Sequence, residues 1–143
     1  MTEPNFKLED FLPYRLSIAA NTVSKQIAKT YAPYKLSRTQ WRVMAVLAGA
    51  DKITAQAVSD KTGMDKTTVS RAVKKMLDRD LISRCADSAD ARATSLSLSG
   101  KGRAMFNKII PEARCQEQTL KGTFSAKDLQ MLISFLDKIT DGN

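Results

Sequence analysis

One short segment of the sequence carries hydroxyl and basic side chains at a spacing that could read a nucleic acid. Residues 66–79 place apolar side chains on one side of an amphipathic helix and polar ones on the other, and Asp65 can cap its start. Small hydroxyls lie near the start and long cations follow, which suits a helix that enters the major groove of DNA. The candidate contacts in this helix are Lys66, Thr67, Thr68, Ser70, Arg71, Lys74 and Lys75.

Different roles are expected along this helix. Arg71 is long enough to reach a guanine, to which a guanidinium can donate two hydrogen bonds. Lys74 and Lys75 are expected to meet the flanking phosphates. Thr54, which can cap a shorter helix just before, is a further candidate contact. The alternative is an ordinary amphipathic helix whose cations only face water.

A hairpin is expected directly after this helix. Residues 81–85 and 94–98 are short strand-like segments, and residues 86–93 are small and polar, which predicts a long loop at the tip. Arg92 in that loop could enter a narrow minor groove, where negative potential is concentrated. Asp90 could hold the arginine in place through an ion pair, although such a pair could equally be an ordinary surface contact worth less than about 1 kcal/mol.

The elements that must position these residues are mostly helices. Apolar spacing predicts a helix over residues 8–31, closed by Pro33, and Ser37 with Gln40 forms a capping box for a second helix that ends at Gly49. The order helix, turn, helix, hairpin is that of a winged helix–turn–helix. We therefore expect a mainly α (α+β) fold with long helices at both ends of the chain.

The terminal helices carry more apolar surface than a small central domain needs. Beyond the hairpin, Ser99 caps a long helix that Pro111 should kink, and Ser125 starts the last one. Packing of these stripes within one chain is the alternative to burial against a symmetric partner, and we favour the partner.

Composition excludes several classes of function. The 143 residues suit one domain, and 23 Lys and Arg against 15 Asp and Glu give a net charge of +8, which favours a polyanionic partner. The absence of histidine excludes a Ser–His–Asp triad, and two cysteines cannot complete a zinc site. We expect no enzyme, no cofactor and no metal. No signal peptide or membrane-length apolar run is visible, which predicts a cytoplasmic protein without membrane contact.

Five short motifs, in order and at matching spacing, resemble the MarR family of bacterial winged helix–turn–helix regulators. They are Leu36–Met44, Asp65–Arg71, Asp80–Arg84, Asp90–Arg92 and Leu96–Gly102. The resemblance implies a homodimer formed by the N- and C-terminal helices, a pseudo-palindromic operator, and release of DNA when a small molecule binds or a cysteine is oxidised. Asp80 stands where the family usually has glycine, so a looser turn is expected, and Arg92 is single where some members have two arginines.

The resemblance also sets the expected domain boundaries. One MarR-type domain would span residues 1–143, with a winged-helix lobe over about 37–100 and dimerisation helices over about 8–32 and 100–140. A ligand cleft between lobe and dimer helices could be lined by Tyr14, Arg15, Tyr34, Trp41 and Arg42, although such aromatic side chains are often simply core.

Three hypotheses for function remain at this point. The first is a transcriptional regulator, expected to be a repressor released by a small anionic or phenolic ligand. The second is a regulator on the same scaffold that is switched by oxidation of Cys85 or Cys115. The third is a winged-helix module that binds another protein rather than an operator, and the basic helix and Arg92 argue against it.

Overall fold

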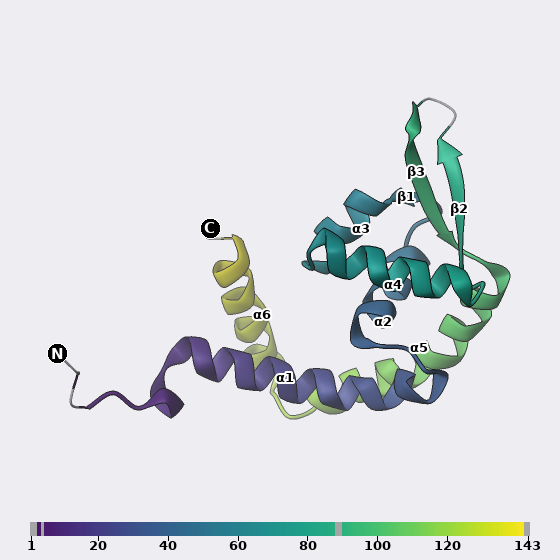
Figure 1. Cartoon of the computed structure of the whole chain (residues 1–143). Helices are drawn as coiled ribbons and strands as arrows, with labels where there is room; N and C mark the ends of the chain where they lie inside the picture. Colours follow the sequence, from purple (N-terminus) through teal and green to yellow (C-terminus); the bar gives the residue numbers. More distant parts are fainter. Residues whose placement is uncertain (1–2, 4, 88–89, 142–143) are drawn as a thin grey trace. The chain divides into compact units, whose positions relative to one another are not determined.

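The computed structural model describes residues 3, 5–87 and 90–141, and it describes the side chains of these residues except for 86–93. The chain divides into two compact units, Met1–Ile109 and Ile110–Asn143. Its elements (Figure 1) are α1 (Leu12–Tyr31), α2 (Arg38–Ala48), β1 (Ile53–Thr54), α3 (Ala55–Thr62), α4 (Lys66–Asp78), β2 (Ile82–Asp87), β3 (Asp90–Leu98), α5 (Gly100–Lys121) and α6 (Ala126–Asp141). The predicted fold class, mainly helical with a small antiparallel sheet, is confirmed.

The first helix begins later than its apolar pattern predicts. Leu8–Asp10 form a separate 3-10 turn, and α1 starts at Leu12. Pro13 explains the difference, because proline has no N–H to donate and therefore suits the first turn of a helix. At the other end Pro33 lies in a second 3-10 turn, as expected of a residue that closes a helix.

The predicted helix starts in the first unit are confirmed by side-chain caps. The Gln40 amide donates to Ser37 Oγ at 3.1 Å, and Gln40 Oε1 accepts from the Ser37 amide at 2.9 Å. Thr54 Oγ1 accepts from the Ala57 amide at 3.1 Å, and α3 then ends at Gly63 with a φ of 68°. That left-handed conformation favours glycine, and it sets the short turn before α4.

The turn from α4 into the hairpin is tight, so the expectation of a looser turn at Asp80 is wrong. Asp80 takes the left-handed conformation, with a φ of 57°. Its amide donates to the Leu77 carbonyl at 3.0 Å, and the Leu81 amide donates to the Met76 carbonyl at 2.9 Å. These two bonds form a complete Schellman motif. Aspartate is among the few residues other than glycine that enter this conformation at modest cost.

The hairpin differs from the predicted one in its length. The sheet has the order β1–β3–β2, and both pairs are antiparallel. A long loop over residues 86–93 was expected, but β2 extends to Asp87 and β3 begins at Asp90, with a register shift after Ala86. Backbone groups form the ladder whatever the side chains are, so small polar residues do not end it. Figure 1 shows β2 and β3 extending beyond α4.

A third strand, β1, was not predicted. Its two residues pair with β3, Ile53 opposite Leu96 and Thr54 opposite Ser95. A strand of two residues is too short for alternation to be visible in the sequence. It joins the loop before α3 to the hairpin.

One hydrophobic core holds the first unit together. The apolar side chains predicted to face inward from α4 are buried, apart from half-buried Leu77. They pack with side chains from neighbouring elements, and the fully or almost fully buried members are Val43, Met44, Leu47, Val58, Val69, Met76, Leu81, Leu96 and Ile109. At the hairpin exit, Ser99 Oγ accepts from the Gly102 amide at 3.0 Å and starts α5 as predicted.

The second unit consists of the end of α5 and all of α6. Ser125 Oγ accepts from the Asp128 amide at 3.1 Å, which confirms the predicted cap. Pro111 lies inside α5, and a kink there stays a prediction. In the described part of the chain, no helix combines the length and apolar character needed to cross a bilayer.

Candidate nucleic-acid interface

The outward side of α4 is a continuous polar surface. Val69, Ala72, Val73 and Met76 are buried on the core side of the helix. Among the described side chains no carboxylate lies within ion-pair distance of the cations on the opposite side. The exposed residues are Lys66, Thr67, Ser70, Arg71, Lys74 and Lys75, which is the division between faces that the sequence predicts.

Asp65 fixes the start of this helix. Its Oδ1 accepts from the Thr68 amide at 2.8 Å, and its Oδ2 accepts from the Thr68 hydroxyl at 2.9 Å. These hydrogen bonds, the backbone one first, favour the charged carboxylate and lower the pKa of Asp65. The hydroxyls of Thr68 and Thr54 therefore both have structural partners, and their contacts with DNA stay predictions.

A shallow pocket separates α4 from the start of α2. It has a volume of about 180 Å³ and is lined by Ser37, Thr39, Gln40, Thr68, Arg71, Ala72 and Lys75. Arg71 and Lys75 thus lie on the α2 side of the helix. Thr39 was not predicted as a functional residue, although the capping box at Ser37 places it in the first turn of α2.

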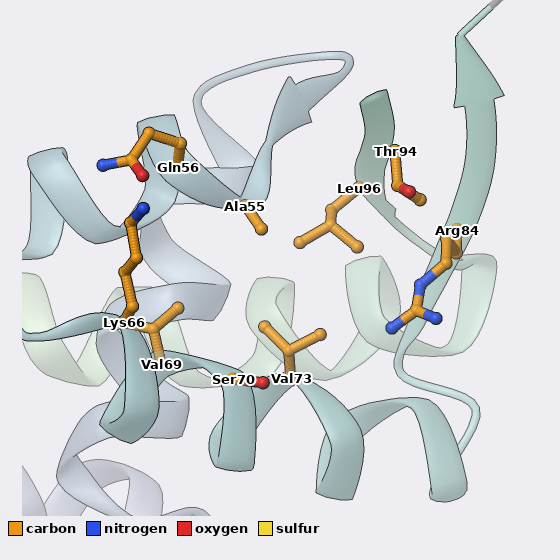
Figure 2. A pocket seen from close by; sticks show the side chains of 9 residues that line it. All are labelled: Ala55, Gln56, Lys66, Val69, Ser70, Val73, Arg84, Thr94 and Leu96. Atoms are coloured by element: carbon orange, nitrogen blue, oxygen red, sulfur yellow. The ribbon is translucent and has the colours of Figure 1, made fainter. Parts of the chain in front are cut away.

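A larger pocket, here called the wing pocket, lies between α4 and the hairpin (Figure 2). Its volume is about 490 Å³, and its lining residues are Ala55, Gln56, Lys66, Val69, Ser70, Val73, Arg84, Thr94 and Leu96. Arg84 is exposed on β2, opposite Leu96 in the ladder. Arg84 was not predicted as a functional residue, because a lone cation in a strand gives no sign of a site when the strand register is unknown.

The two predicted wing residues are only partly described. The backbone of Asp90 and Arg92 belongs to β3, whereas their side chains lie outside the described part of the structure. The ion pair between them, and their contact with the minor groove, stay predictions.

Arg79 holds the far end of α4. Its Nη1 donates to the Lys35 carbonyl and its Nη2 donates to the Tyr34 carbonyl, each at 2.8 Å. Lys35 has a φ of 59°, so this fork of two hydrogen bonds from the Arg79 guanidinium binds a left-handed turn at the junction of α1 and α2. The end of the candidate reading helix is thereby joined to the junction that precedes α2.

Trp41 and Arg42, two of the residues predicted to line a ligand cleft, are neighbours on α2. Trp41 stacks on Tyr31 with ring centroids 5.5 Å apart and on Phe106 with centroids 5.8 Å apart. Burial raises the pKa of Tyr31, and the positive charges of Arg38 and Arg42 lower it by a smaller amount. Burial, and next the positive charge of Arg38, lower the pKa of Arg42. The three stacked rings of Tyr31, Trp41 and Phe106, here called the aromatic wall, thus lie beside two guanidinium groups.

The remaining cleft residues do not all lie there. Tyr34 is half-buried in the 3-10 turn after α1 and packs against the core that contains Tyr31. Tyr14 and Arg15 line a different pocket at the start of α1. At 1.5 Å per helical residue, Tyr14 lies about 25 Å from Tyr31 along the helix axis. One small ligand cannot touch both ends of α1 within a single chain.

The two cysteines do not form a disulfide. Cys85 is half-buried in β2, Cys115 is exposed on α5, and both are free thiols. A redox role for either stays a prediction. Among residues 3, 5–87 and 90–141, no cluster of acidic or cysteine side chains could hold a metal ion.

Comparisons with known proteins agree on one family. Residues 34–93 match the model of the MarR family. Over 97% of this chain and 93% of the relative, the sequence is 24% identical to the HTH-type transcriptional regulator MhqR of Bacillus subtilis. A crystal structure of a MarR family transcriptional regulator from Silicibacter pomeroyi is 26% identical, with a TM-score of 0.82 over 99% of this chain and 97% of that one.

A third protein, BpsR of Bordetella bronchiseptica, has a similar fold. It is 22% identical, with a TM-score of 0.87 over 96% of this chain and 99% of BpsR. The family match covers the second helix, both helices of the helix–turn–helix and the first part of the hairpin, and the likenesses extend over nearly the whole chain. The winged-helix segment of the chain therefore matches the MarR family of transcriptional regulators, and nearly the whole chain is similar to a solved regulator of that family.

Proposed function

We propose that the chain regulates transcription by binding duplex DNA through α4 and the β2–β3 hairpin. The observation that carries this proposal is the exposed, cationic side of α4, free of ion pairs among the described side chains. A helix held by a cap at its start and a guanidinium fork at its end can present that side to the major groove without distortion. BpsR, which has a similar fold, is itself a protein whose DNA binding is regulated.

The residues divide into base-reading and phosphate-binding groups. Thr67, Ser70 and Arg71 lie on the outward side of α4 and would approach base edges. Lys66 and Lys75 line pockets on opposite flanks of the helix and would meet the two phosphate backbones beside the groove. Lys74 would join them, and Arg92 on the hairpin would enter the minor groove.

Salt dependence tests this interface. With about 6–10 phosphates neutralised per dimer, the logarithm of the association constant should fall with the logarithm of salt at a slope of about −5 to −9. The double variant Lys74→Gln, Lys75→Gln should make the slope shallower, whereas Lys29→Gln on α1 should leave it unchanged. A slope near zero, or no binding to any genomic fragment, would support the protein-binding module instead.

The active form would be a homodimer of single MarR-type domains spanning residues 1–143. Within each unit, α1 and α6 leave large apolar side chains exposed, among them Leu12 at 64% and Phe135 at 50%. Surfaces of this kind on a monomer mark an interface. The helices over about 8–32 and 100–140 would form it, and two copies of α4 would then read a pseudo-palindromic operator.

Release of DNA would follow binding of a small anionic or phenolic ligand at the aromatic wall. Trp41 is half-buried against the rings of Tyr31 and Phe106 and leaves part of its apolar surface exposed, and Arg38 and Arg42 lie close enough to influence the pKa of Tyr31. An aromatic carboxylate would meet both features, packing against the exposed part of the tryptophan ring and pairing with a guanidinium. BpsR is regulated by such a compound, 6-hydroxynicotinic acid. The chain would thus act by binding rather than by catalysis, as a repressor.

Fluorescence of the single tryptophan tests the ligand proposal directly. Titration with 6-hydroxynicotinic acid, and with 4-hydroxyphenylacetate as a second probe, should quench Trp41 in the wild-type protein and weaken DNA binding. Arg42→Gln should reduce the affinity for both probes, while Arg114→Gln on α5 should not. Loss of DNA binding upon mild oxidation, without any ligand, would favour the redox alternative.

A further inference from the structure

We propose that Arg79 and Lys101 are positioning residues for DNA recognition, which set the spacing between the two half-sites that a dimer accepts. They would act by fixing α4 to the helices of the dimer, whereas the exposed side of α4 would read the bases. The inference rests on the proposed DNA-binding homodimer, and it adds the side chains that hold each reading helix in its place.

The turn between α4 and β2 (Figure 1) is bound by the residues that begin α5. Lys101 Nζ donates to the carbonyl of Arg79, the C-cap of α4, at 3.0 Å. The hydroxyl of Ser99 donates to the Asp80 carbonyl, and the amide of Ser99 donates to the Leu81 carbonyl at 3.0 Å. Three consecutive carbonyls of the turn therefore accept hydrogen bonds from the start of α5.

The side chain of Arg79 joins the same turn to the end of α1. Its guanidinium donates to the carbonyls of Tyr34 and Lys35 at 2.8 Å each, and Tyr34 lies in the 3-10 turn directly after α1. Hydrogen bonds from a charged donor are stronger than neutral ones. One residue at the end of α4 thus accepts a bond from α5 and donates two bonds to the segment after α1. Both of these helices belong to the proposed dimer interface.

These two cations bind backbone carbonyls, unlike the exposed cations on the outward side of α4. Arg79 is half-buried, and its Nη1 and Nη2 each donate to a carbonyl. Lys101 brings a positive charge to the C-terminal end of α4, where the helix dipole is negative. Both contacts therefore stabilise one position of α4 relative to the end of α1 and the start of α5.

The accepted spacing depends on this position, because two copies of α4 must fit the same duplex. One additional base pair moves the half-sites apart by about 3.4 Å and rotates them by about 35°. Shared between two protomers, this requires a displacement of about 1.7 Å for each α4. Such a displacement along the bonds of 2.8–3.0 Å at Arg79 would stretch them beyond about 3.5 Å, where a hydrogen bond is lost. A wrong spacing would thus cost the free energy of these bonds.

The experiment measures dissociation constants of the full-length protein for a set of duplexes. All contain two copies of the half-site selected by the wild-type protein, at spacings from two base pairs below the best spacing to two above it. Spacing discrimination is the dissociation constant one base pair from the best spacing divided by that at the best spacing. Arg79→Met removes two charged hydrogen bonds and should lower this ratio about tenfold, and Lys101→Met removes one exposed bond and should lower it about threefold.

Matched variants and a second readout separate positioning from a general structural role. Lys108→Met removes an exposed cation from α5 within the same unit and should keep the wild-type ratio. Lys101→Arg retains a charged donor and should restore the ratio. A general loss of affinity enters both dissociation constants alike and leaves their ratio unchanged. The base preference within each half-site, measured by selection from a random DNA pool, should stay that of wild type in Arg79→Met and Lys101→Met.

The outcomes distinguish this inference from the proposed function. Variants that keep the wild-type ratio, or a wild-type protein that binds every spacing equally, would overturn the role of Arg79 and Lys101 alone. A changed base preference within the half-site would also overturn it, because the residue would then act on base reading. A wild-type protein that binds no duplex would refute the DNA-binding function itself. Since Lys101 is exposed, Lys101→Met tests the inference even where Arg79→Met does not fold.

Discussion

At the scale of single residues, replacing Arg71 and replacing Arg92 should affect DNA binding in different ways. Arg71→Ala removes a guanidinium from α4 and should relax the preference at one base pair of each half-site, at a cost of about 1–3 kcal/mol for a lost bidentate contact with guanine. Arg92→Ala should weaken binding to many sequences together, because a wing arginine senses groove width and potential. Selection of sites from a random DNA pool checks both.

The outcome of that selection also tests where α4 faces. Both variants should remain folded, since Arg71 is exposed and Arg92 does not occupy one of the apolar positions of the sequence that form the core. If Arg71→Ala keeps the full wild-type motif, the arginine binds phosphate from its place beside α2 and another residue reads the base.

Asp65 should make the stability of α4 depend on pH. Its pKa is lower in the folded chain than in the unfolded one, because the charged form accepts hydrogen bonds from Thr68. The stability it adds is therefore present above the unfolded pKa and is lost as pH falls through the folded pKa. The thermal midpoint of Asp65→Ala should lie below that of wild type at neutral pH, and the gap should shrink in acid. Thr67→Ala, which removes a side chain without a titratable group from the same turn of α4, is the control, and its gap to wild type should not change with pH.

At the scale of elements, two glycines at the start of α5 provide a matched pair. A Cβ on Gly102 would overlap the Leu81 carbonyl oxygen and would lie 3.2 Å from Leu98 Cδ2, whereas nothing lies within 4 Å of a Cβ on Gly100. Gly102→Ala should therefore destabilise the chain by about 1–3 kcal/mol, as overpacking does. Gly100→Ala should be neutral or slightly stabilising. Denaturant unfolding measures both, and equal effects would mean that α5 moves away from the turn without cost.

Elements with local signals could be predicted, and elements that depend on distant partners could not. Ser37, Thr54, Asp65, Ser99 and Ser125 mark helix starts through bonds to amides a few residues away, so the sequence is sufficient there. Strand β1 forms only because β3 lies beside it. The strands of the hairpin extend beyond the segments that the side-chain pattern predicts.

The candidate site follows the same distinction. The exposed side of α4 follows from helical spacing and was predicted. Arg84 and Thr39 were missed because their positions beside α4 depend on the sheet register and on the packing of α2. Tyr14 was grouped with Trp41 by residue type alone, and the length of α1 separates them.

At the scale of the whole molecule, the exposed apolar side of α6 should determine the oligomeric state. Phe135→Glu places a charge beside Met131 and Ile139, which lie one helical turn away on either side and are 43% and 46% exposed in one chain. A charge buried in an interface without a partner is costly, so this variant should sediment as a monomer at micromolar concentration. Lys138→Glu also changes the charge of α6 and should remain a dimer. A wild-type protein that sediments as a folded monomer of about 16 kDa would contradict the proposed dimer.

The fork of Arg79 has a consequence for conformational entropy. Helix ends normally fray, and a protein that orders them on binding loses part of its affinity. In this chain Asp65 holds the first turn of α4, and Arg79 ties the last turn to the carbonyls of Tyr34 and Lys35. The reading helix is therefore ordered when the chain folds, before any DNA is bound. The cost of fixing its shape is then part of the folding free energy and does not reduce the affinity for an operator.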